Sequence, residues 1–316
     1  MTQTTHLSYQ WVAQPPTFLW QAVPFLAIDT EFVWRTTYRP IPALIQIKTP
    51  YDVVLVDAPA IKEWHWMADM FASDTLFVLH AAEGDLDIFY QLSRAIPKNI
   101  FDTQVAAAFL GMGRSLSLKA LVKKCLGITL SKTQSMSDWL KRPLSDAQKR
   151  YAAEDVLYLP QLYELLSRQL KERGLYDFFR QDMQMLSNWR PADDRDAYQQ
   201  VKGSWVLGNE PRAWSILASL AEWREQQARQ INCPRKHVLK DEALVWLSQH
   251  RPQRLQDLYL CPELSKQQKK RYGRALLTLI NASEINYDIT PVRRLIDIPD
   301  GTKLLREMKM CAARQA

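Results

Sequence analysis

The sequence predicts an α/β domain in its first half and an all-helical domain in its second. Three observations support this prediction. Strand-like apolar runs crowd residues 24–58, strand-like and helical segments then alternate up to about residue 110, and helical periodicity dominates after residue 205. At 316 residues, the chain also exceeds the size at which one hydrophobic core usually stops growing. We therefore expect two domains.

The first half begins with three short apolar runs separated by turn or proline-containing segments: residues 24–32, 43–48 and 52–58. Runs this close together favour an antiparallel meander. A strand at 74–81, a helix at 83–95 and a short strand at 99–104 follow. This alternation predicts that parallel strands extend the meander into a mixed sheet.

The rest of the chain reads as helix, with one polar interruption. Residues 115–173 have helical patterns, and Pro160 should bend or divide the second long segment. The stretch 188–204 is polar and lacks apolar periodicity, which indicates a linker. Beyond it, two stripes with i, i+3, i+4, i+7 spacing predict amphipathic helices: Trp214, Leu217, Ala218 and Ala221, and Tyr272, Ala275, Leu276 and Leu279.

Composition and charge narrow the class of protein. With 47% apolar and 24% charged residues, the chain is typical of a soluble globular protein. It has neither a leader-like start nor an apolar run of about 18 residues, so we expect a cytoplasmic protein without a membrane partner. Its four cysteines form no C-x-x-C pair, which argues against a zinc knuckle or a disulfide framework.

Positive charge is concentrated in the second half of the chain. Residues 1–199 hold 21 Lys and Arg against 22 Asp and Glu, whereas residues 200–316 hold 20 against 12. Such asymmetry suggests a polyanionic partner, with nucleic acid the first candidate. A basic surface that serves only solubility is the alternative.

Two carboxylates stand inside a strand-like run. Asp29 and Glu31 of "AIDTEF" point to the same face of a strand, while Thr30 points to the other. Burial and mutual repulsion penalise this arrangement in a core, but hard divalent cations prefer such oxygen ligands. An exposed strand edge that binds nothing is the commoner context for D-x-E.

Two further acidic segments follow along the chain. Glu83, Asp85 and Asp87 lie just past a predicted strand, where α/β sheets place ligand-binding groups, although acids at a helix start are also common as caps. In "YAAEDVLYL", Asp155 lies four residues after Tyr151 on a predicted helix, and Glu154 lies three after it. Spacing alone leaves the choice of acid open in both segments.

Taken together, these motifs resemble the DEDD family of 3′→5′ exonucleases, and within it the DEDDy branch, which includes the ribonuclease D family. "DTEF", "HAAEGDLDIF" and "YAAEDV" match the three motifs in order, and "LIQI", "FDTQ" and "DWLKRPL" extend the likeness over residues 20–180. The resemblance implies a ribonuclease H-like mixed sheet flanked by helices. It also favours Asp85 and Asp155 in the two open choices.

The second half resembles an HRDC domain, a small helical module that binds nucleic acid. The resemblance implies an exonuclease domain at 1–190, a linker at 191–204, an HRDC domain at 205–283 and the start of a second, incomplete HRDC-like unit at 284–316.

The family resemblance implies a metal-dependent 3′→5′ exoribonuclease that releases 5′-mononucleotides. Two divalent cations, Mg²⁺ or Mn²⁺, would be held by four acids, with Asp29 shared between both ions. Glu31 and Asp155 would complete the site of the attacking water, Asp85 would serve the leaving-group ion, and Tyr151 would orient the water.

The implied partner is RNA, with transfer RNA precursors carrying a free 3′ end as the first candidate. We expect a monomer without an organic cofactor. The expected substrate-binding residues come from both halves of the chain: Thr30, His80, Lys269, Lys270, Arg271 and Arg274. His80 is alternatively a packed residue, and Tyr272, which lies on an apolar stripe, is expected in the core. A DNA exonuclease and an inactive RNA-binding scaffold are the competing functions.

Overall fold

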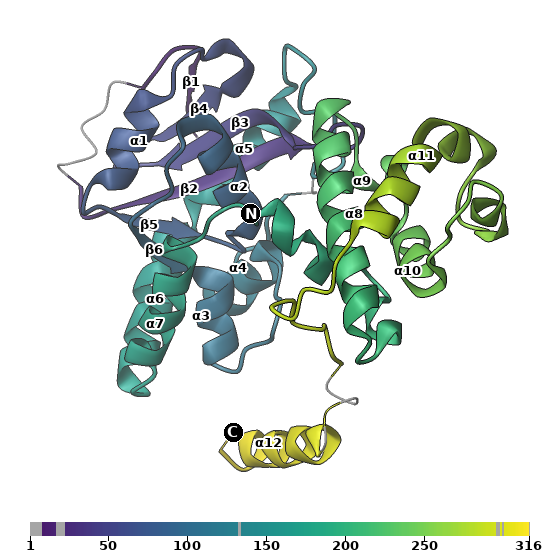
Figure 1. Cartoon of the computed structure of the whole chain (residues 1–316). Helices are drawn as coiled ribbons and strands as arrows, with labels where there is room; N and C mark the ends of the chain where they lie inside the picture. The colour runs from purple at the N-terminus through teal and green to yellow at the C-terminus, as the bar shows by residue number, and fades with distance from the viewer. Residues whose placement is uncertain (1–7, 17–22, 132–133, 295–297, 299, 316) are drawn as a thin grey trace. The chain divides into compact units, whose positions relative to one another are not determined.

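The computed structural model describes residues 8–16, 23–131, 134–294, 298 and 300–315. The chain forms two compact units (Figure 1). The first comprises Met1–Trp34 and Pro40–Pro191, and the second comprises Arg35–Arg39 and Ala192–Ala316. Among the described residues, no helix is long and apolar enough to cross a lipid bilayer.

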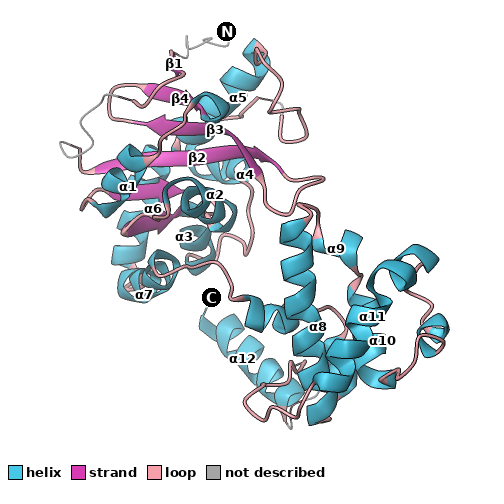
Figure 2. Cartoon of the chain, turned by 45° about the horizontal axis from the view of Figure 1, so that its top comes forward, coloured by secondary structure: helices cyan, strands magenta, loops and turns pink. Residues whose placement is uncertain are grey.

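The first unit is built on a six-stranded mixed sheet with the order β1-β4-β3-β2-β5-β6 (Figure 2). Its strands are β1 (Gln10–Val12), β2 (Phe25–Val33), β3 (Ile41–Lys48), β4 (Val53–Asp57), β5 (Leu76–Leu79) and β6 (Asn99–Asp102). β2, β3 and β4 pair antiparallel, and β5 and β6 add in parallel beside β2. The predicted meander with a parallel extension is confirmed.

Helices flank this sheet, as Figures 1 and 2 show. They are α1 (His65–Ala72), α2 (Glu83–Ser93), α3 (Thr103–Phe109), α4 (Leu118–Leu126), α5 (Asp146–Leu157), α6 (Leu159–Glu172) and α7 (Tyr176–Ser187). α5 packs against β2, β3 and β4. It begins at a capping box formed by Ser145 and Gln148, and it ends just before Pro160, which lies in the first turn of α6. The predicted division at this proline is confirmed.

The second unit is helical and has its own core. It contains α8 (Pro211–Gln230), α9 (Arg235–Val238), α10 (Asp241–His250), α11 (Lys266–Ala282) and α12 (Gly301–Gln315), with short 3₁₀ helices η3 (Asp194–Gln200), η4 (Ser204–Leu207) and η5 (Asp257–Leu260). Trp214 and Tyr272 are both buried, as their stripes predict. Ala275 differs from the prediction: it is exposed, because the buried stripe of α11 passes through Gly273 and Leu276 instead.

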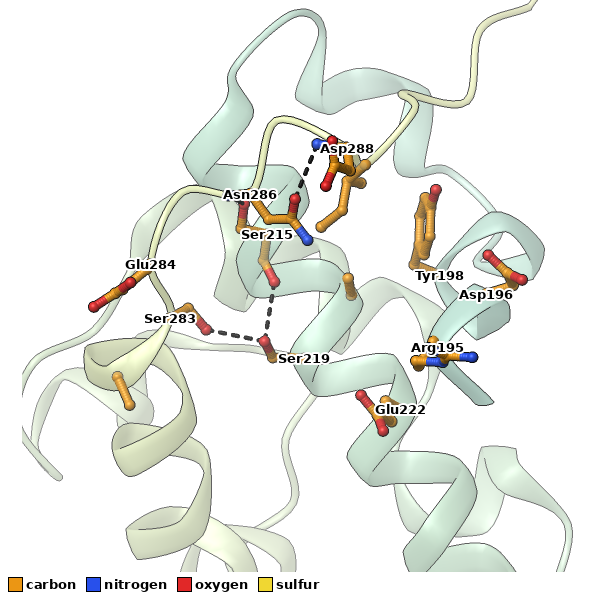
Figure 3. Close-up of a pocket in the computed structure, with 13 residues that line it drawn as sticks. Arg195, Asp196, Tyr198, Ser215, Ser219, Glu222, Ser283, Glu284, Asn286 and Asp288 are labelled. Atoms are coloured by element: carbon orange, nitrogen blue, oxygen red, sulfur yellow. Dashed lines mark hydrogen bonds between the residues drawn. The ribbon is translucent and has the colours of Figure 1, made fainter. Parts of the chain in front are cut away.

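After α11 the chain returns to α8 (Figure 3). The Ser283 hydroxyl contacts the Ser219 hydroxyl at 3.1 Å, and the backbone N–H of Asn286 donates to the Ser215 hydroxyl at 2.9 Å. The residues that directly follow the predicted HRDC boundary at 283 therefore pack within the second unit.

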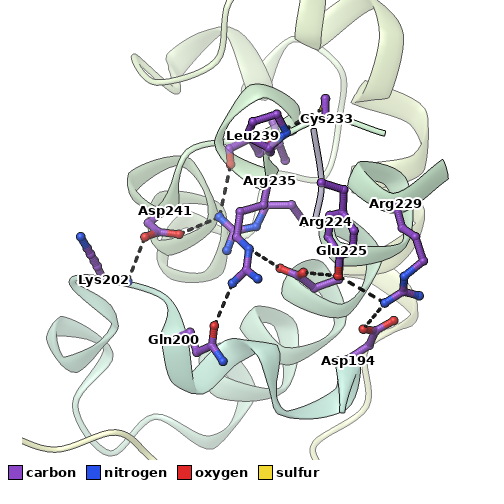
Figure 4. A network of polar contacts seen from close by, with 12 residues as sticks. Asp194, Gln200, Lys202, Arg224, Glu225, Arg229, Cys233, Arg235, Leu239 and Asp241 are labelled. Carbon is purple, nitrogen blue, oxygen red and sulfur yellow. Dashed lines mark hydrogen bonds and ion pairs between the residues drawn. The ribbon is translucent and has the colours of Figure 1, made fainter. Parts of the chain in front are cut away.

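Residues 191–204, expected to be a linker, largely fold into the second unit instead. Ala197, Tyr198 and Val201 are buried in its core. A polar network ties the same stretch to the following helices (Figure 4), with Asp194 paired to Arg229 at 2.6 Å and the backbone N–H of Lys202 donating to Asp241 at 3.2 Å. The 3₁₀ turns lack the 3.6-residue period, and their partners are distant in sequence, so the apolar pattern gave no sign of them.

Candidate active site

The acidic residues of interest lie on, or on helices next to, the part of β2 that extends beyond β5. β5 pairs with Phe25, Leu26 and Ala27 of β2, and this pairing stops before Asp29. The second half of β2 therefore has an open edge at the carboxyl end of β5, and α2 begins nearby. Ligand-binding groups in α/β sheets commonly occupy such a position.

Asp29 and Glu31 line one face of this part of β2. On β3, Gln46 lies opposite Asp29 and Leu44 lies opposite Glu31. The register shifts between Glu31 and Phe32, which indicates an irregularity in the strand just after the second acid. Both carboxylates keep partial solvent contact.

Asp85 approaches from the first turn of α2. It is buried, whereas Glu83 is exposed and Asp87 is partly exposed. The Thr30 hydroxyl donates to Asp85 Oδ1 at 2.5 Å, and the backbone N–H of Thr30 is a further donor to this carboxylate. Burial thus separates Asp85 from Glu83 and Asp87, which sequence spacing alone could not do.

α5 contributes Tyr151 and Asp155. A hydrogen bond from Tyr151 reaches the Asp155 carboxylate, as expected for residues four apart on one helix. Glu154 instead accepts the backbone N–H of Ser131 at 3.0 Å. Glu154 and Asp155 therefore differ in their surroundings. Glu154 binds the loop that contains Ser131, whereas Asp155 interacts electrostatically with Asp29.

The pKa values show that the four carboxylates share one electrostatic site. Burial raises the pKa of Asp29 to about 7, while the Thr30 backbone N–H opposes this shift. Burial, followed by repulsion from Asp29, Asp155 and Asp85, raises the pKa of Glu31 to about 10. Burial and then Asp29 raise the pKa of Asp155 to about 9 and move the pKa of Asp85 upward as well. Asp29 is the common neighbour of the other three.

The donor set fits hard divalent cations, which bind oxygen ligands. In the described chain, no Lys or Arg forms an ion pair with any of the four acids, so their negative charge lacks an internal counter-ion. As the side chains stand, however, no three Asp, Glu, His or Cys residues of the described ranges form a ready cage for an ion.

Repulsion among the acids explains both their raised pKa values and the absence of three clustered metal ligands among the described residues. Carboxylates without a counter-ion repel one another, and internal donors on Thr30 and Tyr151 engage Asp85 and Asp155. Ligation by these four residues stays a prediction.

Asp102, to which sequence analysis assigned no role, supports the second acidic segment. Its carboxylate accepts the backbone N–H groups of Ala81 and Ala82, at 3.1 and 2.9 Å, and also caps α3. Ala81 has a φ of 60°, a conformation that costs energy for alanine and that these bonds help to hold. The turn between β5 and α2, which precedes Asp85, is fixed in this way. Asp102 lies at the end of β6 directly before a helix, and that N-cap position is the signal that could have revealed it.

His80 is held by protein groups at both ring nitrogens. Nδ1 lies 2.9 Å from the Thr103 hydroxyl, and Nε2 lies 3.0 Å from the Leu116 carbonyl oxygen. Burial lowers its pKa. These contacts match the packed alternative for His80, and its contact with substrate stays a prediction.

The second unit carries a basic surface on α11. We call the row Lys266, Lys270 and Arg274 the basic row: its members are spaced by four residues, share one side of the helix and are exposed. In the described chain, none of the five Lys and Arg residues of α11 forms an ion pair. Of the predicted phosphate contacts, Lys270, Arg271 and Arg274 are exposed and Lys269 is partly buried.

Tyr259 is an aromatic residue at this surface to which sequence analysis gave no role. It is 65% exposed, and the Lys269 ammonium lies 5.2 Å from its ring centroid. Its helix, η5, packs closely on α11 at Gly273, where an added Cβ would lie 3.1 Å from side-chain carbons of Leu255 and Leu258. On the surface of α11, Gly273 lies next to the basic row. The exposed ring of Tyr259 therefore lies near cations that form no ion pair in the described chain. Tyr272, in contrast, is buried as predicted.

A separate hollow of about 490 Å³ lies between α8, η3 and the segment after α11 (Figure 3). Its lining includes Asp196, Glu222, Glu284 and Asp288, with Arg195 as the single basic residue. This excess of carboxylates is unfavourable for a phosphate backbone. The basic row is therefore the better candidate for contact with nucleic acid in the second unit.

Comparison with known proteins agrees with both halves of this description. A family model described as 3'-5' exonuclease matches residues 19–171, and the HRDC domain model matches residues 215–280. Ribonuclease D of Pseudomonas paraeruginosa is 35% identical over 301 residues, covering 94% of this chain and 80% of that protein. The chain belongs to the ribonuclease D family. Ribonuclease D of a Shewanella species is 31% identical, covering 92% of this chain and 76% of that one.

Solved structures support the same family assignment. The crystal structure of Escherichia coli RNase D, described as an exoribonuclease involved in structured RNA processing, has a TM-score of 0.83 at 28% identity. The match covers 98% of this chain and 84% of that one. The catalytic core of Trypanosoma brucei RRP6, with a TM-score of 0.59 at 22% identity, shares the fold.

These findings establish the class of reaction. The protein is a hydrolase of the ribonuclease D type, a 3′→5′ exoribonuclease with a nucleic acid substrate, and its family implies divalent metal ions as cofactors. The predicted fold class, a mixed sheet flanked by helices followed by a helical HRDC domain, is confirmed.

Proposed function

We propose that this exoribonuclease trims the 3′ ends of structured RNA precursors, with transfer RNA precursors as the main substrate, and releases 5′-mononucleotides. Support for the proposal comes from the mutual repulsion that helps to raise the pKa values of Glu31, Asp85 and Asp155, carried by β2, α2 and α5, none of which forms an ion pair in the described chain. We further propose that it acts as a monomer in the cytoplasm, where such precursors are processed.

Asp29, Glu31, Asp85 and Asp155 would hold two Mg²⁺ or Mn²⁺ ions. When bound, such ions acidify the attacking water, neutralise the phosphoryl oxygens and stabilise the departing 3′ oxygen. We assign Asp29 as the ligand shared between the ions, as the family resemblance implies, and repulsion from Asp29 contributes to the raised pKa of each of the other three acids.

The protein's own groups would orient the reactants. Tyr151 contacts Asp155, so its hydroxyl can fix the direction of the attacking water beside that acid. The bound ions would already acidify the water, so we assign Tyr151 the role of an orienting group. The Thr30 hydroxyl on β2 donates a hydrogen bond to Asp85 on α2 and so holds its carboxylate in place.

The second unit would hold the RNA backbone. The basic row supplies cations for phosphates, and Tyr259 supplies an exposed ring for one stacked base. A positively charged surface with an aromatic platform is typical of proteins that bind single-stranded nucleic acid. Such a surface would favour substrates with an unpaired 3′ end.

The test is digestion of end-labelled transfer RNA precursor and of single-stranded DNA of matched length, with Mg²⁺ or Mn²⁺ and then with EDTA. We expect 5′-labelled RNA to shorten stepwise from its 3′ end, 5′-mononucleotides to appear, and EDTA to stop the reaction. Preferred degradation of DNA would replace this proposal with a DNA exonuclease. Binding without products under every metal condition would indicate an inactive scaffold.

A further inference from the structure

Gln46, in the middle of β3, has no evident structural reason to be polar. It is completely buried, and neither its amide nitrogen nor its amide oxygen meets a hydrogen-bond partner in the described chain. A buried carboxamide without partners loses its bonds to water and gains none in exchange, so it destabilises the fold relative to an apolar residue of the same shape.

The strand register places Gln46 beside the acidic site. Gln46 is the direct partner of Asp29 in the antiparallel pairing of β2 with β3. Residues directly opposite each other in such a pair project from the same face, with their Cβ atoms about 4.5–5.5 Å apart. Helix α5, which carries Tyr151 and Asp155, packs against both strands. The orphaned amide therefore belongs to the face of the sheet from which Asp29 projects.

An amide suits this position chemically. Its NH₂ group can donate to a carboxylate and so fix the orientation of that group, whereas a lysine or arginine would compete with a cation for the negative charge. A further acid would add to the repulsion already present among the four carboxylates. Hydrogen bonds from neighbouring residues commonly orient the ligands of metal ions in this way.

We propose that Gln46 is a positioning residue for Asp29: its amide N–H donates to the Asp29 carboxylate when that acid holds cations. The inference rests on the proposed function of the carboxylate site. It explains why the fold keeps an amide that has no partner of its own among the described residues. Gln46 acts through Asp29 and does not itself contact the reacting atoms.

The decisive experiment compares Gln46→Met with the wild-type protein in two assays that need no substrate. Calorimetric titration with Mn²⁺ measures cation affinity, and thermal unfolding in EDTA measures the stability of the metal-free fold. We expect Mn²⁺ affinity to fall about 10- to 100-fold, as is typical when a residue that orients a metal ligand is lost. The Tm in EDTA should stay the same or rise, because methionine fills the site without an unsatisfied amide.

Gln169→Met is the matched control. Gln169 lies on α6 and also has a buried amide oxygen without a partner in the described chain, but it is not opposite any of the four acids. We expect this variant to retain Mn²⁺ affinity. If Gln46→Met does not fold, Gln46→Asn keeps the amide but shortens its reach by one methylene, and it should also lose affinity.

Unchanged Mn²⁺ affinity in Gln46→Met, or in Gln46→Asn if that variant must be used, overturns the proposal. An equal loss in Gln169→Met also overturns it, because the effect would then be general. Failure of the underlying function gives a different result: Asp29→Asn would keep both Mn²⁺ binding and RNA cleavage. The two failures are therefore distinguishable.

Discussion

The carboxylate site of the first unit and the basic row of the second unit both lack ion-pair partners among the described residues, but they lie in opposite surroundings. The four acids are buried or partly buried, so burial and mutual repulsion raise their pKa values. The basic row lies in solvent, where water screens each cation. Unpaired charge points to a ligand in both regions, yet only the first region incurs a large energetic cost while the ligand is absent. Removing one charged side chain should therefore have a far larger effect in the carboxylate site than in the basic row.

The largest effect is expected at the centre of the acidic site. Asp29→Asn should reduce kcat by at least about 10³-fold, because it removes the carboxylate charge proposed to bind both metal ions. Single-turnover cleavage of end-labelled RNA checks this expectation, with circular dichroism to verify folding. Glu83→Gln, which alters an exposed acid beside Asp85, is the matched control and should cleave normally. Wild-type cleavage by Asp29→Asn would contradict the two-ion proposal.

A smaller loss is expected at Tyr151. Tyr151→Phe keeps the ring and removes the hydroxyl that contacts Asp155. We expect kcat to fall about 10²-fold, because the attacking water loses the group that orients it. Mn²⁺ affinity measured by calorimetry should be unchanged. Tyr163→Phe serves as the control, since Tyr163 packs against Phe25 and Phe101 away from the acids. A fully active Tyr151→Phe enzyme would remove Tyr151 from the mechanism.

The stability of the metal-free protein should depend on pH in a direction that the raised pKa values fix. The folded-state pKa is about 7 for Asp29, about 9 for Asp155 and about 10 for Glu31, against ordinary values near 4, so the folded state binds more protons than the unfolded state above about pH 4. Stability in EDTA should therefore fall as pH rises from 5 to 8. The loss that Asp29 contributes should level off near pH 7, whereas the losses from Asp155 and Glu31 should continue above it. Urea unfolding measures this trend.

Added Mg²⁺ should restore more stability at pH 8 than at pH 5, because the ligands must be deprotonated to bind it. The double variant Asp29→Asn with Glu31→Gln should show a flatter pH dependence in EDTA. An identical slope in this variant would mean that other groups control the effect.

The smallest effects are expected in the second unit. Replacing Lys266, Lys270 and Arg274 with alanine should lower the slope of log Kd against log salt by about 2, at about 0.7 per phosphate contact for a single strand. Tyr259→Ala should weaken RNA binding about tenfold, whereas Tyr259→Phe should not, because stacking of one base contributes about 1–3 kcal/mol. Fluorescence anisotropy with the inactive Asp29→Asn protein measures both.

Exposed residues of the same unit supply the controls. Lys202→Ala with Arg212→Ala alters net charge outside α11, and Tyr287→Ala removes another exposed ring. A salt slope that these controls lower as much as the basic row does would show that the basic residues only keep the protein in solution.

The local pattern of apolar residues predicted much of the fold. It failed where an element is very short or is held by contacts distant in sequence. The meander, the parallel addition and the break at Pro160 each depend on signals within a few residues. β1 was missed because three residues are too few to show a period. Sequence pattern predicts a linker after Pro191, but long-range contacts such as Asp194 with Arg229 fold much of this stretch into the second unit, and no local repeat reveals such contacts.

The sequence by itself determined the kinds of chemical group available: acids in three ordered segments, a tyrosine four residues before the last acid, and an excess of positive charge in the second half. Tertiary structure decided which of these groups meet. It buried Asp85 and left Glu83 exposed, turned Glu154 to a loop and Asp155 to the acids, and placed the amide of Gln46 beside Asp29. The physical reason is that burial and strand register depend on partners far apart along the chain, and both set the energy of a charged group.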